Sequence, residues 1–182
     1  MPITINGSGT VTGISVGGLP DGIVDADTLA SGATSDNTPA FVAYKTAEQD
    51  TTQNTDTLLE MSTEGLDTDS AYDTSTSKFT IPSGKGGYYL IGVTLTINEG
   101  SAHYYKVIMY KNGSGGFYQN GYTTDTSNTV GKFTTQWAVN LAAGDYIQLY
   151  VWCNGANAGE RRIYRDNQYG TTCWSAIRIA GQ

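Results

Sequence analysis

The sequence predicts an all-β protein built as a two-sheet antiparallel sandwich. Gly 23 and Tyr 13 among 182 residues, with abundant Thr, Ser and Asn, are typical of short strands joined by tight turns. Short alternating runs recur at regular spacing, and most are bounded by Gly, Asn, Asp or Ser. Residues 71–90 combine a turn, a short strand, a Pro/Gly corner and an aromatic strand. Nothing in the pattern favours long helices.

The first part of the chain, residues 1–36, differs in texture from the rest. It is nearly devoid of aromatics and alternates short β-branched runs with NG, GG, PDG and SG turns. Its apolar positions need burial, but the segment is too short to supply a second layer. We therefore expect an extended, β-rich collar that orders by winding around copies of itself in a trimer or by docking on another protein. Residues 31–38 are the expected linker.

Residues 37–182 are expected to form the sandwich. The polar stretch from 47 to 70 is interpreted as a long loop that flanks one strand. Asn112-Gly113 predicts a hairpin bend, and the last two strands are expected to pair as the final hairpin. The predicted strands lie near 40–46, 57–62, 77–81, 86–98, 102–111, 116–122, 130–140, 145–154 and 172–180.

Cys153 and Cys173 are the only cysteines, at the end and the start of these last two strands. Alternation places Cys153 on one face with Ile147, and Cys173 on one face with Ile177, so both thiols are expected to point inward. If the strands pair, the thiols lie opposite each other. A disulfide and two buried free thiols remain alternative interpretations.

Charge and composition exclude several classes of function. A net charge of −7 and an isoelectric point near 4.4 disfavour DNA or RNA as a partner, because that affinity depends on clustered Lys and Arg. No apolar run is long enough to insert in a membrane, and the N-terminus lacks the pattern of a signal peptide. One His and no CxxC motif argue against a metal site, and no cofactor motif is present.

The sequence offers no convincing catalytic group. Acidic clusters at Asp67, Asp69 and Asp73, and in the N-terminal segment at 21–27, are interpreted as turn or loop carboxylates, with calcium binding by residues 67–73 as the alternative. His103 is the one imidazole and is interpreted as a surface or subunit-facing residue. No GxSxG or Walker-type motif is present, so we expect no enzymatic activity.

A loop between the last two strands concentrates positive charge and tyrosine. Arg and Tyr are enriched in binding hot spots, so this loop is the predicted contact surface for a partner or receptor. Pairing of its arginines with acids of a neighbouring subunit is the alternative. A second aromatic group, Phe117, Tyr118 and Tyr122, is expected to be buried or at an interface, with sugar stacking as the alternative. The predicted contact residues are Arg161, Arg162, Tyr164, Arg165 and Tyr169.

Several motifs resemble the globular head of complement C1q, a relative of the tumour necrosis factor fold. They are the AYD turn and KFT strand followed by PSGKGGYY, the PAFVAYK start at Pro39, the LAAGDY strand entry and the closing SAIRIAG. The resemblance is thin between 47 and 70. It implies a jelly roll, a homotrimer and a binding or structural module. Asp73 and Asp145 match acidic positions of that signature.

The run INGSGTVTGISVGGLPDGIVDADTLA, residues 5–30, is similar to an N-terminal element of structural proteins from marine and cyanobacterial tailed phages. That resemblance implies a virion protein, made in the host cytoplasm, whose residues 1–36 bind other virion proteins. The expected function is a trimeric tail fibre or receptor-binding tip that attaches to host-surface glycan. A head decoration protein is the alternative, and a polysaccharide-degrading tailspike is a further one.

Overall fold

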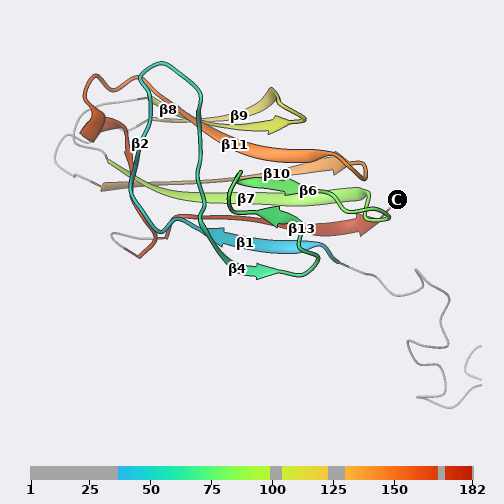
Figure 1. Ribbon diagram of the computed structural model, residues 1–182. Helices are drawn as coiled ribbons and strands as arrows, with labels where there is room; N and C mark the ends of the chain where they lie inside the picture. The colour runs from blue at the N-terminus through green and yellow to red at the C-terminus, as the bar shows by residue number, and fades with distance from the viewer. Residues whose placement is uncertain (1–36, 99–103, 123–129, 168–170, 182) are drawn as a thin grey trace, which may run out of the picture. The chain divides into compact units, whose positions relative to one another are not determined.

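The computed structural model describes residues 37–98, 104–122, 130–167 and 171–181, all within the unit Asp36–Gln182. These residues form two antiparallel sheets that pack face to face, with β8, β9 and β11 in one layer and β1, β4, β7 and β13 in the other (Figure 1). The predicted all-β sandwich is confirmed. The N-terminal segment 1–36 lies outside the described residues. The described residues contain no helix that is long and apolar enough to cross a membrane.

Sheet A is organised around its longest central strand, β7. β10 pairs with β7 along its whole length, from Val130 opposite Asn98 to Leu141 opposite Gly87. On the other side of β7 lie β13, then β1, then β4, while β12 and β2 extend the sheet beyond the start of β13. The strands are β1 (Ala40–Tyr44), β2 (Gln49–Asp50), β4 (Thr63–Asp67), β7 (Gly87–Asn98), β10 (Val130–Leu141), β12 (Arg162–Ile163) and β13 (Cys173–Gly181).

Sheet B is organised around β11. β8 and then β9 lie on one side of β11, and β6 with β5, together with β3, lie on the other. The 3₁₀ helix η1 (Ala158–Arg161) connects β11 to β12 of the opposite sheet. The strands are β3 (Thr57–Leu58), β5 (Tyr72–Asp73), β6 (Lys78–Thr80), β8 (Tyr104–Lys111), β9 (Ser114–Tyr122) and β11 (Tyr146–Cys153).

The hairpin between β8 and β9 turns at Asn112 and Gly113, as the sequence predicts. Their φ angles are 53° and 78°, both in the left-handed region that a two-residue hairpin of type I′ requires. Asn and Gly tolerate that conformation better than other residues. This turn therefore fixes the register of the two strands that carry the outer edge of sheet B.

The core lies between the sheets and is rich in aromatic rings. The ring of Phe41 stacks on Tyr72 with centroids 4.7 Å apart, and Trp174 meets Phe41 edge-on at 5.0 Å. Phe79 lies 4.6 Å from Phe41 and 5.8 Å from Tyr89. Alternate residues of β7 and β11 complete the core, because every second side chain of a strand points to the same face. These are Ile91, Val93, Leu95, Ile97, Ile147, Leu149 and Val151.

Two expectations about the strands are wrong. β11 and β13 do not form a hairpin, because β11 belongs to sheet B and β13 to sheet A. The stretch from 47 to 70 contains β2, β3 and β4 instead of one strand near Leu58. β4 has the sequence TEGLD and is mostly exposed, so it lacks the apolar alternation by which strands are recognised.

Buried tyrosines predict an alkaline limit to stability. Burial raises the pKa of Tyr72 to about 12 and also raises the pKa of Tyr105. A tyrosine of the unfolded chain titrates near pH 10, so the unfolded state loses its protons first. The stabilisation is complete below about pH 10 and is lost as the pH rises toward 12.

We expect the free energy of unfolding in urea to fall by roughly 2 to 3 kcal/mol for Tyr72 alone across this range. The free energy of unfolding of Tyr72→Phe should fall less steeply with pH than that of the natural chain. Equal slopes for the two proteins would contradict this account.

Candidate functional site

The outward face of sheet B carries a row of aromatic side chains. Tyr105, Val107 and Met109 of β8 are buried in the core, so alternation turns the residues between them away from it. β11 follows the same rule around Leu149 and Val151. The outward residues are Tyr104, Lys106, Ile108 and Tyr110 on β8, and Tyr146, Gln148, Tyr150 and Trp152 on β11.

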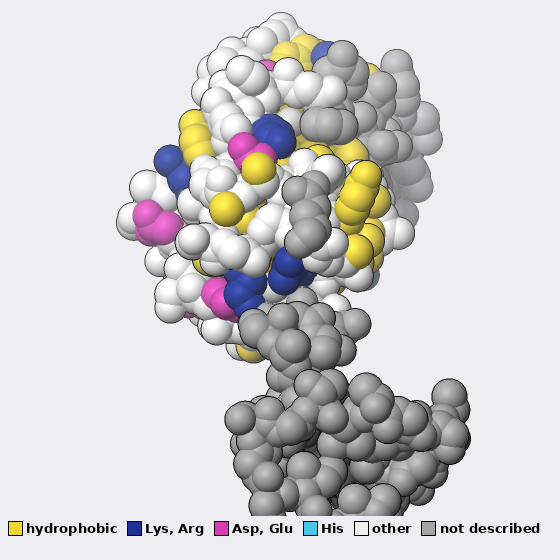
Figure 2. Space-filling view, turned by 90° about the vertical axis from the view of Figure 1, so that its right-hand side faces the viewer, with side chains coloured by type: hydrophobic (Ala, Val, Ile, Leu, Met, Phe, Trp, Pro, Cys, Tyr) yellow, Lys and Arg dark blue, Asp and Glu magenta, His cyan; other side chains and the backbone are white. Residues whose placement is uncertain are grey.

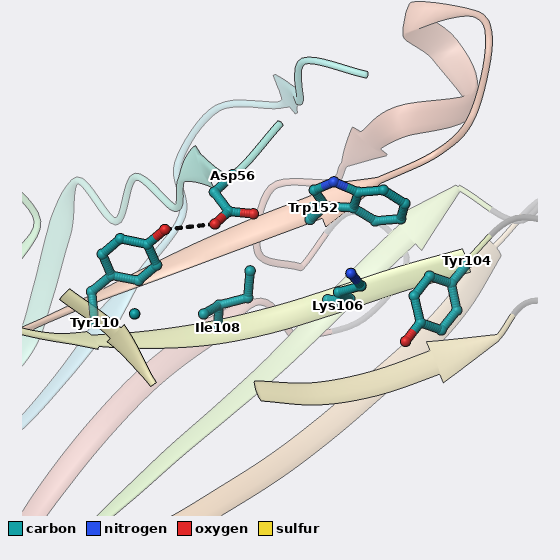
Figure 3. A pocket seen from close by; sticks show the side chains of 7 residues that line it. Asp56, Tyr104, Lys106, Ile108, Tyr110 and Trp152 are labelled. Carbon is teal, nitrogen blue, oxygen red and sulfur yellow. Dashed lines mark hydrogen bonds between the residues drawn. The ribbon is translucent and has the colours of Figure 1, made fainter. Parts of the chain in front are cut away.

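Part of this face is hollowed into a groove of about 400 Å³. In Figure 3 the side chains of β8 lie along the groove, while Trp152 of β11 and Asp56, from the segment before β3, face them. We call this site the aromatic groove, and its lining residues are Asp56, Tyr104, Lys106, Ile108, Tyr110, Gly115 and Trp152.

One end of the aromatic groove combines two rings with a cation. Trp152 lies directly opposite Lys106 in the pairing of β11 with β8. The Lys106 Nζ lies 4.3 Å from the centroid of the Trp152 ring and 5.5 Å from that of Tyr104. The two rings meet edge-on at 5.7 Å. The ammonium group is thus held by the negative faces of the rings.

The other end combines a tyrosine with a carboxylate. Tyr110 donates a hydrogen bond of 2.5 Å to Oδ2 of Asp56, and that bond raises the pKa of Tyr110 to about 12. The Tyr110 ring also packs on Tyr150, with centroids 4.1 Å apart. A Cβ atom at Gly115 would lie 2.6 Å from Cε1 of Tyr110, so the ring needs glycine at that position. The carboxylate and the ring are therefore held in place.

The aromatic groove has the chemistry of a binding site for a flat, polar molecule. Its rings offer planar apolar surface. Its lysine donates hydrogen bonds, and its carboxylate only accepts them. None of these lining residues belongs to the contact surface predicted from the sequence. The signal was present in YYKVIMYK and YIQLYVW, where alternation separates a buried face from an aromatic one. Their convergence depends on the pairing of β8 with β11, which alternation alone does not give.

In the predicted contact loop, the side chains of Arg161 and Arg162 are bonded to other parts of the same chain. Arg161 donates to the main-chain oxygens of Thr51, Gly155 and Ala156, at 2.7 to 2.8 Å. Arg162 makes two hydrogen bonds to Asp50 and an ion pair with Glu48, at 2.8 to 3.2 Å. These two arginines hold η1 and β12 to the segment around β2. The remaining members of the predicted set are placed as follows: Tyr164 is buried, Arg165 is exposed, and Tyr169 lies outside the described residues.

Contact with a partner through these five residues stays a prediction. His103 also lies outside the described residues. Phe117, Tyr118 and Tyr122 belong to β9, but their side chains are outside what the structure describes.

The two cysteines lie in different sheets and neither forms a disulfide. Cys153 is buried in the core opposite Tyr105, as expected. Cys173 shares a face with Ile177, also as expected, but that face points away from the core, because Trp174 and Ala176 occupy the inward positions. The expectation that both thiols point inward is therefore wrong for Cys173. Burial raises the pKa of each thiol.

Several acidic side chains hold turns. The carboxylate of Asp73 accepts hydrogen bonds from Ser75 and Thr76, which lower its pKa to about 2. Asp145 accepts a bond from the main-chain N–H of Ala142 and forms an ion pair of 2.7 Å with Lys111. On the face in Figure 2, acidic and basic side chains lie beside one another and do not gather into a basic patch.

The outward face of sheet A is different in kind. It carries the four large hydrophobic side chains that are exposed among the described residues, at 39% to 50% exposure. Ile177 lies beside Leu90 of β7 and Ala40 of β1, so the apolar surface continues across neighbouring strands. We call this surface the apolar face, and its exposed members are Leu66, Tyr88, Ile177 and Ile179.

No protein-family model matches the chain, and no curated protein is significantly similar to it. Solved structures are similar in fold. The globular domain of zebrafish complement 1qA protein aligns with a TM-score of 0.59 at 10% identity, covering 81% of this chain and 100% of that chain. Eiger TNF from S. frugiperda aligns with a TM-score of 0.56 at 12% identity, covering 81% and 96%. Murine APRIL aligns with a TM-score of 0.52 at 11% identity, covering 77% and 98%.

The described domain therefore has the jelly-roll fold of the C1q and tumour necrosis factor globular domains. This confirms the fold that the AYD, KFT and PSGKGGYY motifs predict.

Proposed function

We propose that this chain is a virion protein that forms a homotrimeric tail fibre or receptor-binding tip, attaches to host-surface glycan and catalyses no reaction. The contrast between the two outward faces carries the proposal. The apolar face of sheet A has the character of a subunit interface, whereas sheet B presents rings with a cation and a carboxylate. One face suits assembly and the other suits recognition.

The apolar face supports the homotrimer. A large continuous apolar surface on a protein marks a site of contact with another protein. Burying the exposed parts of Tyr88, Ile177 and Ile179 against a second copy would remove that surface from water. In a closed trimer every copy would use the same pair of surfaces. The homotrimer that the resemblance to the C1q globular head implies agrees with this arrangement.

A charge on the apolar face is expected to dissociate the trimer. Ile177→Asp would place a carboxylate on the apolar face, and burying that charge against a second copy would cost free energy. Native mass measurement should give three chains for the natural protein and one for the variant. The matched control is Thr80→Asp, a charge at an exposed position of β6 in sheet B, which should remain trimeric. A single-chain mass for the natural protein would remove the homotrimer from the proposal.

Attachment to glycan is supported by the aromatic groove. Aromatic rings offer flat apolar surface to sugar rings, and polar side chains orient the hydroxyl groups. In a trimer three grooves would act together, so weak single sites would give strong attachment to a repetitive surface. Residues 1–36 would bind other virion proteins, a role supported by the resemblance of residues 5–30 to the phage element.

The full chain should be retained on a panel of neutral and acidic cell-surface glycans without releasing reducing ends. If no glycan of the panel retains the chain, the proposed binding function is overturned. Sustained release of sugar would overturn the proposal that the chain catalyses no reaction. Locating the subunit in an electron-microscopy map of the particle is the test of position. Density on the capsid shell would favour the decoration alternative over the tail.

A further inference from the structure

The cation of the aromatic groove has no anionic partner among the described residues. Some other cations of the domain form ion pairs, such as Lys111 with Asp145 and Arg162 with Asp50, whereas Lys78 also lies over a ring. Among the described residues, the interactions found for the Lys106 ammonium are those with the rings of Trp152 and Tyr104. A cation held over two rings and left without a carboxylate has bonding capacity for an acceptor on a ligand.

The carboxylate of the groove lies at its opposite end. Asp56 is fixed by the hydroxyl of Tyr110, and Tyr110 is four residues from Lys106 on β8. At about 3.3 Å per residue, these two positions are about 13 Å apart along the strand. The groove therefore presents a donor at one end and an acceptor at the other, with Ile108 between them. A bound molecule must match this order.

We propose that the aromatic groove binds a single chain of acidic glycan that runs along β8, with a sugar carboxylate on Lys106 and hydroxyl groups on Asp56. Sugar faces lie on Tyr104 and Trp152 at the cationic end, and on Tyr110 at the other. This inference rests on the proposed glycan-binding function and adds the chemical class of the glycan and the residues that select it. The lysine supplies the preference for an acid, because an ammonium–carboxylate bond is stronger than one to a neutral hydroxyl.

Other polymers fit the groove less well. A nucleic acid requires many cations, whereas this groove has one lysine and, at its other end, a carboxylate that repels phosphate. Proline-rich peptides also dock in aromatic grooves, but proline has no N–H to donate to Asp56. Sugar hydroxyls can donate to Asp56 while a carboxylate accepts from Lys106. The net charge of −7 does not exclude an acidic ligand, because distant exposed charges are screened beyond about 10 Å in salt.

The test compares acidic oligosaccharides with their carboxyl-reduced forms, which keep the sugar rings and carry a neutral primary hydroxyl in place of each carboxylate. The full chain is titrated with uronic-acid and sialic-acid oligosaccharides and each reduced counterpart, at low and high salt. We expect at least one acidic member to bind about five- to tenfold more tightly than its reduced form, and less tightly as salt rises.

Two variants distinguish the contribution of the cation to binding from that of the rings. Lys106→Met keeps the apolar stem and should bind the acidic and reduced forms with equal affinity. Trp152→Ala should lose about tenfold or more with both forms. The matched control is Lys78→Met, because Lys78 also lies over a ring on sheet B, 4.2 Å from the centroid of Tyr146, but outside the groove. That variant should bind like the natural chain.

The outcomes distinguish this inference from the proposed function. Retention of glycans without preference for the acid, or unchanged binding by Lys106→Met and Trp152→Ala, overturns the acidic-glycan site and leaves a glycan-binding head. Retention of no glycan overturns both. Displacement of a bound acidic oligosaccharide by a neutral proline-rich peptide would assign the groove to peptide and also overturn the inference.

Discussion

Trp174→Ala is expected to cost about 3 to 5 kcal/mol of unfolding free energy, the largest loss for a single core substitution in this domain. Trp174 is fully buried on the inward face of β13. Its ring meets Phe41 and Tyr72 edge-on, at 5.0 and 5.2 Å, so it joins a strand of sheet A to one of sheet B. Removing the ring would leave a cavity between rigid strands that cannot collapse around it.

The comparison with Trp174→Phe makes this prediction specific. The indole Nε1 is buried and has no hydrogen-bond partner among the described residues. Replacing Trp174 by phenylalanine removes an unsatisfied donor and keeps most of the aromatic surface. The loss of unfolding free energy should therefore be well below that of Trp174→Ala. Urea unfolding should be measured at one protein concentration, because assembly contributes to stability. Similar losses for the two variants would show that the ring volume is not what stabilises this contact.

Alternation predicted the buried face of β11 correctly but assigned Cys173 of β13 to the wrong face of its sheet. Residues 86–98 and 145–154 were expected as strands, and Ile91, Val93, Leu149 and Val151 take the buried positions that a period of two assigns to them. Alternation states which residues share a face and says nothing about which strand lies beside another. This is why β11 and β13 were paired in the prediction although they belong to different sheets.

The same limit explains the difference between the predicted and observed site. The residue types of the arginine-rich loop are typical of interfaces and predict a contact surface. One of the carbonyls that bind Arg161 belongs to Thr51, which is distant in sequence, so the sequence does not predict that this arginine is bonded within the chain. The aromatic groove depends on Tyr104, Lys106 and Tyr110 of one strand meeting Trp152 of another and Asp56 of a third segment. Each is unremarkable alone, and only the register of β8 with β11 makes them a site.

Short polar segments show a further limit. The sequence predicts that Asp67 is a turn carboxylate, with calcium binding as the alternative, and the hydrogen bonds confirm the turn. The sequence does not predict that this turn carries the chain from sheet A to sheet B. Asp67 ends β4, and its two oxygens accept hydrogen bonds from the main-chain N–H groups of Asp69, Ala71 and Tyr72, at 2.8 to 3.3 Å. These bonds position Tyr72 in the core, where its hydroxyl donates a hydrogen bond of 3.0 Å to the Met61 carbonyl.

Asp67→Ala is accordingly expected to cost roughly 2 to 4 kcal/mol, because it leaves the N–H groups of two buried residues, Ala71 and Tyr72, without this acceptor. Asp67→Asn keeps one acceptor oxygen and should lose about half as much. The neighbouring Asp69→Ala is the control: its ion pair with Lys85 spans 3.8 Å near the surface and should contribute less than about 1 kcal/mol. Urea unfolding with near-ultraviolet circular dichroism as a second signal would show whether the aromatic packing around Tyr72 and Phe41 is lost with the bonds. Equal small losses at positions 67 and 69 would mean that the turn is held by its own backbone, and that the crossover between the sheets does not depend on the carboxylate.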